Sequence, residues 1–243
     1  MRAVPALEEG PLAAFSELAP AREVIYAFLS LAFRDSPDCG QLQAFRRAAL
    51  GEGAVESIMT LLNPCLNPAV SGEAWELEAR REFMQLFKVP GGRYVAPYES
   101  VFRDTREIEG KQVCGLLMGQ AAIDVQKWYQ LAALELAPGS RELPDHIALE
   151  LSYVGHLCRK EQEFLACGNL DSLNRTWEMQ RDFLAGHLAV WIRPLRDTIW
   201  EKSEHGYFRA LAEFLVDFVS KDLATLEGLL GPSLGSAVPR YAR

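Results

Sequence analysis

The sequence predicts an all-α protein that forms a single helical domain over residues 1–243. Apolar residues recur at every third or fourth position along most of the chain, which is the period of an amphipathic helix. No segment alternates apolar and polar residues for long enough to indicate a significant strand. We expect two helical halves, about 15–137 and about 144–230, joined by a hinge near 138–143, with a long irregular loop at 88–110.

The N-terminal half begins with the clearest helical pattern, in "PAREVIYAFLSLAFRDSP". Pro20 suits the first turn of this helix, and the closing "DSP" ends it. The segments "CGQLQAFRRAAL", "AVESIMTLLNP" and "SGEAWELEARREFMQLF" follow the same period. The N-terminal half is therefore predicted to be a run of short helices.

The helical period stops after Phe87 and resumes only in "GLLMGQAAIDVQKWYQLAALEL". The segment between them is broken by Pro90, Gly91, Gly92, Pro97 and Gly110. Loops longer than about 12–15 residues are uncommon inside a compact domain and are often functional. This loop is therefore the first candidate site, and "PGS" at 138–140 marks the predicted hinge that follows.

The C-terminal half is predicted to hold helices at roughly 144–167, 171–192, 195–203 and 207–230. Pro194 should end or kink the second of these, because an interior proline removes one backbone hydrogen bond and clashes with the preceding turn. Glycine and proline at 231 and 232 end the last helix.

The balance of acidic and basic residues indicates which kinds of partner the protein can bind. The chain has 25 basic and 33 acidic residues, a formal net charge of -8, which argues against nucleic acid and suits a basic ligand. No apolar run approaches the roughly 18 residues of a membrane span, and Glu8 and Glu9 interrupt the N-terminal apolar residues, so we expect a cytoplasmic protein without membrane insertion. Five cysteines without C-x-x-C spacing indicate reduced thiols.

The stretch "LPDHIALEL" at 143–151 places an acid and a histidine at the start of a predicted helix. Asp145 could be the N-cap of that helix. His146, Glu150 and Tyr153 would form a polar stripe on a solvated helix face. Alternatively, Asp145, His146 and Glu150 would be the acid-base group of a small helical enzyme or nucleotide hydrolase. The pattern alone favours the solvated face.

The motifs of metal and catalytic sites are missing from the sequence. No Glu-x-x-His is present, and the other histidines lie in separate contexts, so we expect neither a metal nor another cofactor. There is no G-x-S-x-G frame and no glycine-rich phosphate loop, which favours a protein that is not an enzyme. In the loop, "PYESVF" could simply pin the backbone to the core, or could form an apolar groove with acidic edges that suits an apolar peptide flanked by arginines.

Three segments together resemble a known family. "FMQLFKVPGGRYVAPYESVF", "LMGQAAIDVQKWYQLAALEL" and "LPDHIALELSYVGHL" are similar in order and spacing to segments of the TorD/DmsD/NarJ family of redox-enzyme maturation chaperones, which show L-F-x-x-P, P-x-E-S-V-aromatic and P-D-H-x-x-x-E-L. The resemblance extends from the first helix to about residue 225. It implies an all-α cytoplasmic chaperone, not an enzyme.

The resemblance also implies partners. Members bind the twin-arginine leader or N-terminal segment of a molybdenum-containing oxidoreductase and hold the apo form of its catalytic subunit until the cofactor is inserted, which delays export. An adaptor of the nitrate-reductase type would instead recognise an N-terminal segment without twin arginines. The protein itself would be a monomer or a domain-swapped dimer, since hinge-linked halves permit swapping.

The matching motif positions give the residues implied to bind the leader. One wall of the groove would consist of Phe83, Leu86, Phe87, Pro90, Pro97, Tyr98, Glu99, Ser100 and Val101. The second wall, near the hinge, would consist of Pro144, Asp145, His146 and Glu150. Val89 stands where many relatives have glycine, and "PYES" differs from the "PWGS" of the dimethyl-sulfoxide-reductase chaperones, so this client is not assigned.

Overall fold

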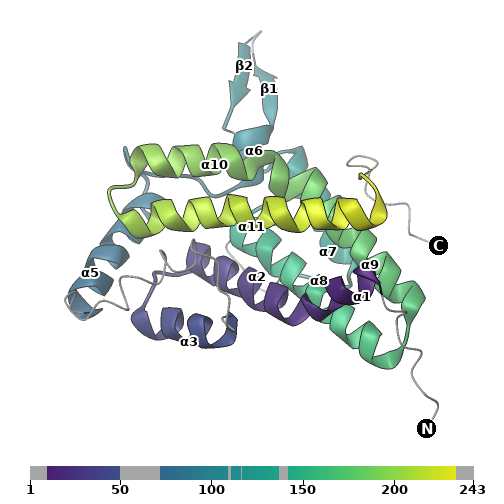
Figure 1. Cartoon of the computed structure of the whole chain (residues 1–243). Helices are drawn as coiled ribbons and strands as arrows, with labels where there is room; N and C mark the ends of the chain where they lie inside the picture. Colours follow the sequence, from purple (N-terminus) through teal and green to yellow (C-terminus); the bar gives the residue numbers. More distant parts are fainter. Residues whose placement is uncertain (1–9, 50–71, 109–110, 116, 137–141, 234–243) are drawn as a thin grey trace.

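The computed structural model describes residues 10–49, 72–108, 111–115, 117–136 and 142–233 (Figure 1). Two predictions fall largely or wholly outside these residues. They are the hinge near 138–143, of which only the end is described, and the helix expected in "AVESIMTLLNP". Within the described chain the predicted all-α class is confirmed.

The N-terminal half contains α1 (Pro11–Glu17), α2 (Ala19–Arg34), α3 (Cys39–Ala49), α5 (Gly72–Phe83) and α7 (Gln120–Leu131). A π-helical turn, η1 (Met84–Lys88), continues α5. Helix α2 begins next to Pro20, as the sequence predicts, and its backbone ends in extended geometry at Asp35. The period of the sequence thus located this helix within a residue or two.

The segment from 88 to 110 is only partly irregular, which corrects the prediction. It contains the short helix α6 (Glu99–Arg103) and the strand β1 (Thr105–Ile108). β1 pairs antiparallel with β2 (Lys111–Cys114), from Thr105 opposite Cys114 to Ile108 opposite Lys111. The hairpin projects from the helical body beside α6 (Figure 1). Each strand has only four residues, which is too short to show an apolar alternation in the sequence.

The C-terminal half contains α8 (Ile147–Cys167), α9 (Leu170–Phe183), α10 (Ala189–Lys202) and α11 (Gly206–Leu230). The π-helical turn η2 (Leu184–Leu188) joins α9 to α10. Helix α10 runs through Pro194, so the prediction that a helix could end at this proline is wrong. The carbonyl that loses its partner belongs to Val190, whose side chain is 46% exposed. Water can therefore reach this side of the helix and replace the missing hydrogen bond.

The core lies between two helix pairs. Helices α10 and α11 pack together, and α2 packs along α8 (Figure 1). A Cβ at Gly155 of α8 would lie 3.3 Å from Cβ of Tyr26 in α2, so the glycine allows this close approach. One face of α8 carries an apolar stripe that is completely buried, formed by Ile147, Leu151, Val154 and Cys158.

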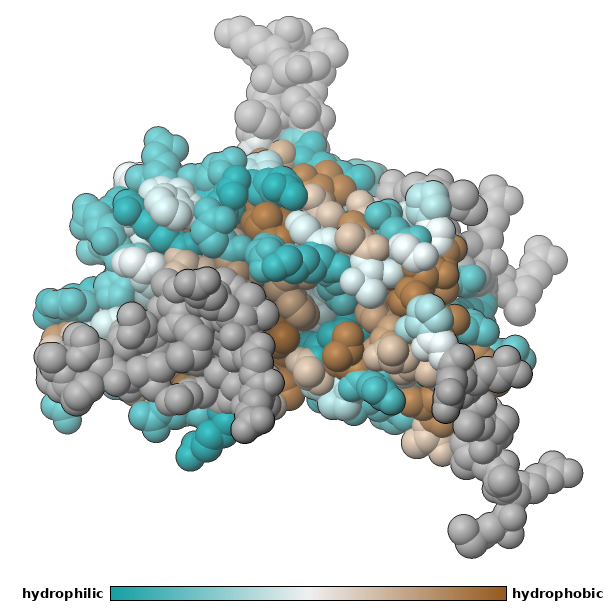
Figure 2. All heavy atoms as spheres, viewed as in Figure 1, coloured by the Kyte–Doolittle hydropathy of each residue, from teal (hydrophilic) through white to brown (hydrophobic). Residues whose placement is uncertain are grey.

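The surface of the molecule carries both hydrophilic and hydrophobic side chains. Figure 2 shows hydrophilic residues over much of α10 and α11, with hydrophobic patches between and beside them. Among the described residues, no helix is both long enough and apolar enough to cross a membrane.

Candidate functional site

The two motif segments that the sequence assigns to opposite walls meet in the structure. The carbonyl of Pro97 accepts a hydrogen bond of 2.9 Å from the Ile147 amide, and the Glu99 amide donates to the Asp145 carbonyl at 3.0 Å. Between these bonds, Tyr98 and His146 form an isolated antiparallel bridge. The loop before α6 and the start of α8 therefore form one continuous junction, which we call the motif junction (residues 97–103 and 144–150).

Asp145 caps a helix, but not the one that the sequence predicts. Its Oδ2 accepts a 2.9 Å hydrogen bond from the Ser100 amide in the first turn of α6. The N-cap of α8 is His146, whose Nδ1 accepts from the Ala148 amide at 3.1 Å. The prediction of Asp145 as the cap of its own helix is wrong, because α8 begins one residue later and the Asp145 side chain faces α6 instead. Burial raises the pKa of Asp145, against the lowering effect of the bond from Ser100.

Replacing Asp145 with alanine should lower the free energy of unfolding by about 1–2 kcal/mol, the usual cost of a lost cap. Asp145→Asn keeps an oxygen acceptor for the Ser100 amide and should lose less. Urea denaturation of the two variants measures both values. Equal losses would mean that the charge of Asp145, and not its hydrogen bond, stabilises the junction.

The polar stripe predicted on α8 is buried, so its interpretation as a solvated face is wrong. His146 and Tyr153 are each 2% exposed and Glu150 is 0% exposed. Oε2 of Glu150 accepts a 3.1 Å hydrogen bond from Nε1 of Trp191 in α10. Tyr98 packs against His146, and Tyr129 packs against Tyr153, so both halves of the chain cover this face of α8. No local feature of "LPDHIALEL" indicates such distant partners.

Glu99 anchors α6 to the C-terminal half. Its carboxylate is buried, and it contacts Nη1 of Arg103 at 2.5 Å and Nδ1 of His187 at 2.9 Å. Arg103 also donates to the Gly186 carbonyl in η2 at 2.7 Å. Arg103 was not among the predicted site residues, although its spacing of four from Glu99 is a usable signal. His187 and Trp191 were not among them either, and the sequence carries no signal for these two.

The first motif lies mainly in the core. Phe83, Leu86 and Phe87 are at most 4% exposed, and the rings of Phe83 and Phe87 pack against each other and against Phe208. Their side chains therefore stabilise the segment that carries the loop. Pro90, in contrast, is exposed.

One polar cluster of the motif junction reaches solvent. The Tyr98 hydroxyl donates to Oε2 of Glu142 at 2.7 Å, and Nζ of Lys88 lies 3.3 Å from Oε1 of the same carboxylate. Burial lowers the pKa of His146 to about 4, so its imidazole is neutral at pH 7 even though Glu142 lies nearby. Of the residues predicted to bind the leader, Pro90, Tyr98 and Val101 keep accessible surface, while the others are buried.

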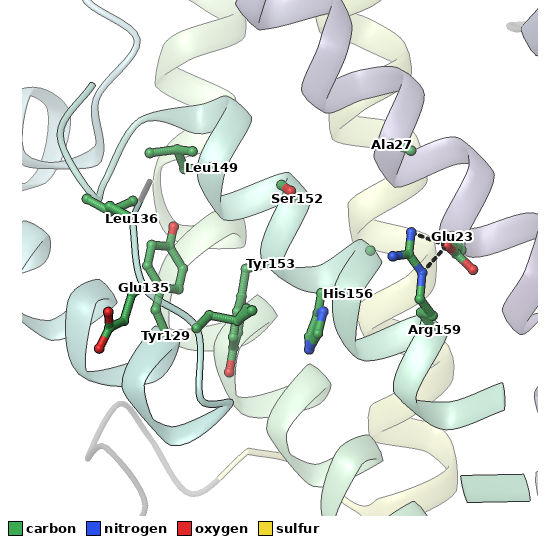
Figure 3. A pocket seen from close by; sticks show the side chains of 12 residues that line it. Glu23, Ala27, Tyr129, Glu135, Leu136, Leu149, Ser152, Tyr153, His156 and Arg159 are labelled. Atoms are coloured by element: carbon green, nitrogen blue, oxygen red, sulfur yellow. Dashed lines mark hydrogen bonds and ion pairs between the residues drawn. The ribbon is translucent and has the colours of Figure 1, made fainter. Parts of the chain in front are cut away.

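A cavity of about 270 Å³ lies beside the junction (Figure 3). It opens between α2, α8 and the chain that follows α7. The Tyr129 hydroxyl, in its wall, donates to the Pro144 carbonyl at 2.8 Å and so connects the cavity with the junction. None of the residues predicted to bind the leader lines it. The lining residues are Glu23, Ala27, Tyr129, Leu134, Glu135, Leu136, Leu149, Ser152, Tyr153, Gly155, His156 and Arg159.

The described residues contain no group of three or more histidine, cysteine, aspartate or glutamate side chains placed to hold a metal ion. Asp145, His146 and Glu150 are also too deeply buried to meet a substrate from solvent. What the junction offers chemically is a rigid, hydrogen-bonded frame with a polar outer edge.

Known proteins with similar sequences carry chaperone names. TorD from Vibrio cholerae serotype O1 is 22% identical over 189 residues, covering 78% of this chain and 80% of that protein. The chlorate reductase assembly chaperone protein of Ideonella dechloratans is 29% identical over 146 residues, covering 60% and 67%. A crystal structure described as a redox enzyme maturation protein from Archaeoglobus fulgidus aligns with a TM-score of 0.47 at 21% identity, covering 82% of this chain and 93% of that one.

The family model of the nitrate reductase delta subunit matches residues 48–197. This range includes the loop, α6, the hairpin, α7, α8 and the junction with α10. Because it spans more than half of the chain, and because the similar proteins include TorD chaperones, the resemblance predicted from the three segments is confirmed: the chain belongs to the nitrate reductase delta subunit family.

Proposed function

We propose that this protein is a cytoplasmic chaperone that binds the leader or N-terminal segment of a molybdenum-containing oxidoreductase and holds its apo form until the cofactor is inserted. The observation that carries the proposal is family membership, joined to the finding that the P-Y-E-S-V-F and P-D-H motifs meet at the motif junction. The relatives compared above are named as chaperones and not as enzymes. The net charge of -8 favours a basic partner segment over an acidic one.

In this proposal, the residues of the predicted leader site divide by burial. The accessible ones, Pro90, Tyr98 and Val101, contact the leader directly, and Glu142 accepts a hydrogen bond from Tyr98. The buried ones position them, since Asp145 holds the start of α6 and Glu99 holds α6 against η2. Burying apolar leader surface would supply most of the affinity, at about 25 cal/mol per Å², while carboxylates supply selectivity.

The proposal is tested by purifying the tagged full-length protein from its native cells and identifying what stays bound by mass spectrometry. We expect the catalytic subunit of a molybdenum-containing oxidoreductase with its leader uncleaved, and no recovery once that leader is deleted from the client. Recovery that survives deletion of the leader would contradict leader binding. Recovery of no such subunit, from cells shown to express one, would overturn the chaperone assignment.

The leader that is recovered also separates the two kinds of client. An adjacent pair of arginines identifies an exported enzyme, and substituting both arginines in the client should then reduce its recovery. A client without the pair identifies the adaptor type.

A further inference from the structure

The cavity beside the motif junction has the form of a small binding site. At about 270 Å³ it is slightly smaller than the roughly 300–1,000 Å³ of sites for drug-sized ligands, which suits one long side chain and its neighbour. Figure 3 shows Tyr129, Leu136 and Leu149 at one end and His156 with the Glu23–Arg159 pair at the other. Glu135 lies at the same end as Tyr129 and Leu136 (Figure 3), so this end combines apolar side chains with one carboxylate, while the other end is polar.

The charges around the cavity favour a cation. Glu135 and Glu23 both line it. Nη2 of Arg159 lies 2.7 Å from Oε1 of Glu23 and balances one of these carboxylates. Within the described part of the chain, the exposed carboxylate of Glu135 has no hydrogen bond or ion pair. The cavity thus keeps one unbalanced negative charge, and an anionic ligand would meet repulsion there.

The wall contains hydrogen-bonding capacity that the described residues do not use. The Tyr153 hydroxyl and Nε2 of His156 are buried and have no partner among these residues. Tyr153 is 2% exposed, and leaving such a group unpaired typically costs about 1–3 kcal/mol. Burial lowers the pKa of His156, so the imidazole is neutral and one ring nitrogen can accept a hydrogen bond from a cationic donor.

We propose that this cavity binds an arginine side chain of the client's leader, with its guanidinium near Glu135 and its apolar stem and neighbouring residue against Leu136, Leu149 and Tyr129. Arginine fits better than lysine because its stem covers apolar surface while its planar group donates several hydrogen bonds. The inference rests on the proposed function and specifies where the positive charge of the leader is recognised.

The test uses the full-length protein and a fluorescently labelled peptide with two adjacent arginines followed by alanines and leucines. The matched peptide has glutamine in place of both arginines. Fluorescence anisotropy should show that the unmodified protein binds the arginine peptide about tenfold more tightly than the glutamine peptide. Equal affinities would overturn the inference.

Two variants locate the binding. Glu135→Gln removes the unbalanced charge, and Ser152→Leu places a larger side chain at an exposed helical position in the cavity wall. Each variant should lower the affinity for the arginine peptide about tenfold, and Glu135→Gln should leave the affinity for the glutamine peptide unchanged. Glu201→Gln, at an exposed position on α10 outside the cavity, is the matched control for charge and should change neither affinity.

Tyr153→Phe separates binding from folding. Because the hydroxyl has no partner among the described residues, its removal should leave the melting temperature unchanged or slightly higher, while the arginine peptide binds several-fold more weakly. If Glu135→Gln and Ser152→Leu both bind the arginine peptide as the unmodified protein does, the cavity is not the site. Capture of a client from cells would then still support the proposed function. Conversely, if the arginine peptide binds at the cavity but no client is recovered from cells, the proposed function is overturned and the binding site stands.

Discussion

Replacing Arg22 with alanine will lower the free energy of unfolding by about 3–5 kcal/mol, the range observed when one partner of a buried charge cluster is removed. Arg22 is 4% exposed, and its guanidinium donates to Asp222 at 2.7 Å, to Glu161 at 3.0 Å and to Gln180 at 2.5 Å. The Tyr26 hydroxyl completes the cluster with a 2.6 Å bond to Asp222.

The size of this effect follows from what the substitution leaves behind. The cluster connects α2, α8, α9 and α11, so its acceptors stay buried when the guanidinium is gone. Burial alone would lower the pKa of Arg22, but surrounding negative groups, Asp222 and Glu161 among them, outweigh it and raise that pKa. Without the positive charge, both carboxylates must either remain ionised without compensation or take up a proton.

Urea denaturation of two further variants shows whether the planar geometry of the Arg22 guanidinium or its charge is responsible for the stabilisation. Arg22→Lys keeps the charge but cannot reach three acceptors with a planar group, so its loss should lie between those of the unmodified protein and Arg22→Ala. Lys221→Ala removes one partner of a surface pair whose side chains are 68% and 41% exposed, and should cost at most about 1 kcal/mol. A loss for Arg22→Ala as small as that for Lys221→Ala would mean that the cost of burying these charges cancels their attraction.

The helices could be predicted from the sequence because helical periodicity is a local property. The apolar positions of "PAREVIYAFLSLAFR" locate α2, and the period after the P-D-H segment locates α8. The same pattern could not show that Arg22 is buried. Its partners are 139 to 200 residues away in the sequence. An arginine on a helix is usually exposed to solvent, so the local pattern alone would place Arg22 at the surface.

The candidate site was predictable only in part, for the same reason. The motif segments were recognised, and the structure brings Ser100 and Asp145 together across 45 residues. Their individual roles depended on contacts that the sequence does not encode locally. Asp145 turned out to cap α6, and the cavity is lined by residues of α2, α7, α8 and the chain after α7, none of which was predicted to bind the leader. The four-residue strands of the hairpin were missed because they are too short to produce a period.

Replacing Glu150 with glutamine will stabilise the protein increasingly as the pH rises above about 4.5, the ordinary range of a glutamate side chain. Burial raises the pKa of Glu150 well above that range, and the nearby charge of Glu99 raises it further. The folded state therefore retains a proton that the unfolded chain releases. Between the two pKa values, stability falls as pH rises, by up to about 1.4 kcal/mol per pH unit.

Glutamine removes this cost without losing the frame of the junction, because its side-chain oxygen can still accept the hydrogen bond from Trp191. Burial also raises the pKa values of Asp145 and Glu161, while hydrogen bonds lower those of Glu82 and Glu142. These groups are present in both proteins, so subtracting the two unfolding free energies at each pH largely cancels them. The difference isolates Glu150 and the neighbours that respond to its charge.

The measurement is urea denaturation of the unmodified protein and Glu150→Gln from about pH 4 to about pH 8. A glutamate of ordinary pKa completes its titration within this range. The difference in unfolding free energy should be small at the acidic end and grow steadily toward neutral pH. Glu201→Gln, at an exposed position, should give a difference that stays near zero throughout. A constant difference for Glu150→Gln as well would show that the carboxyl titrates as it does in water, and the motif junction would then have to admit solvent around α8.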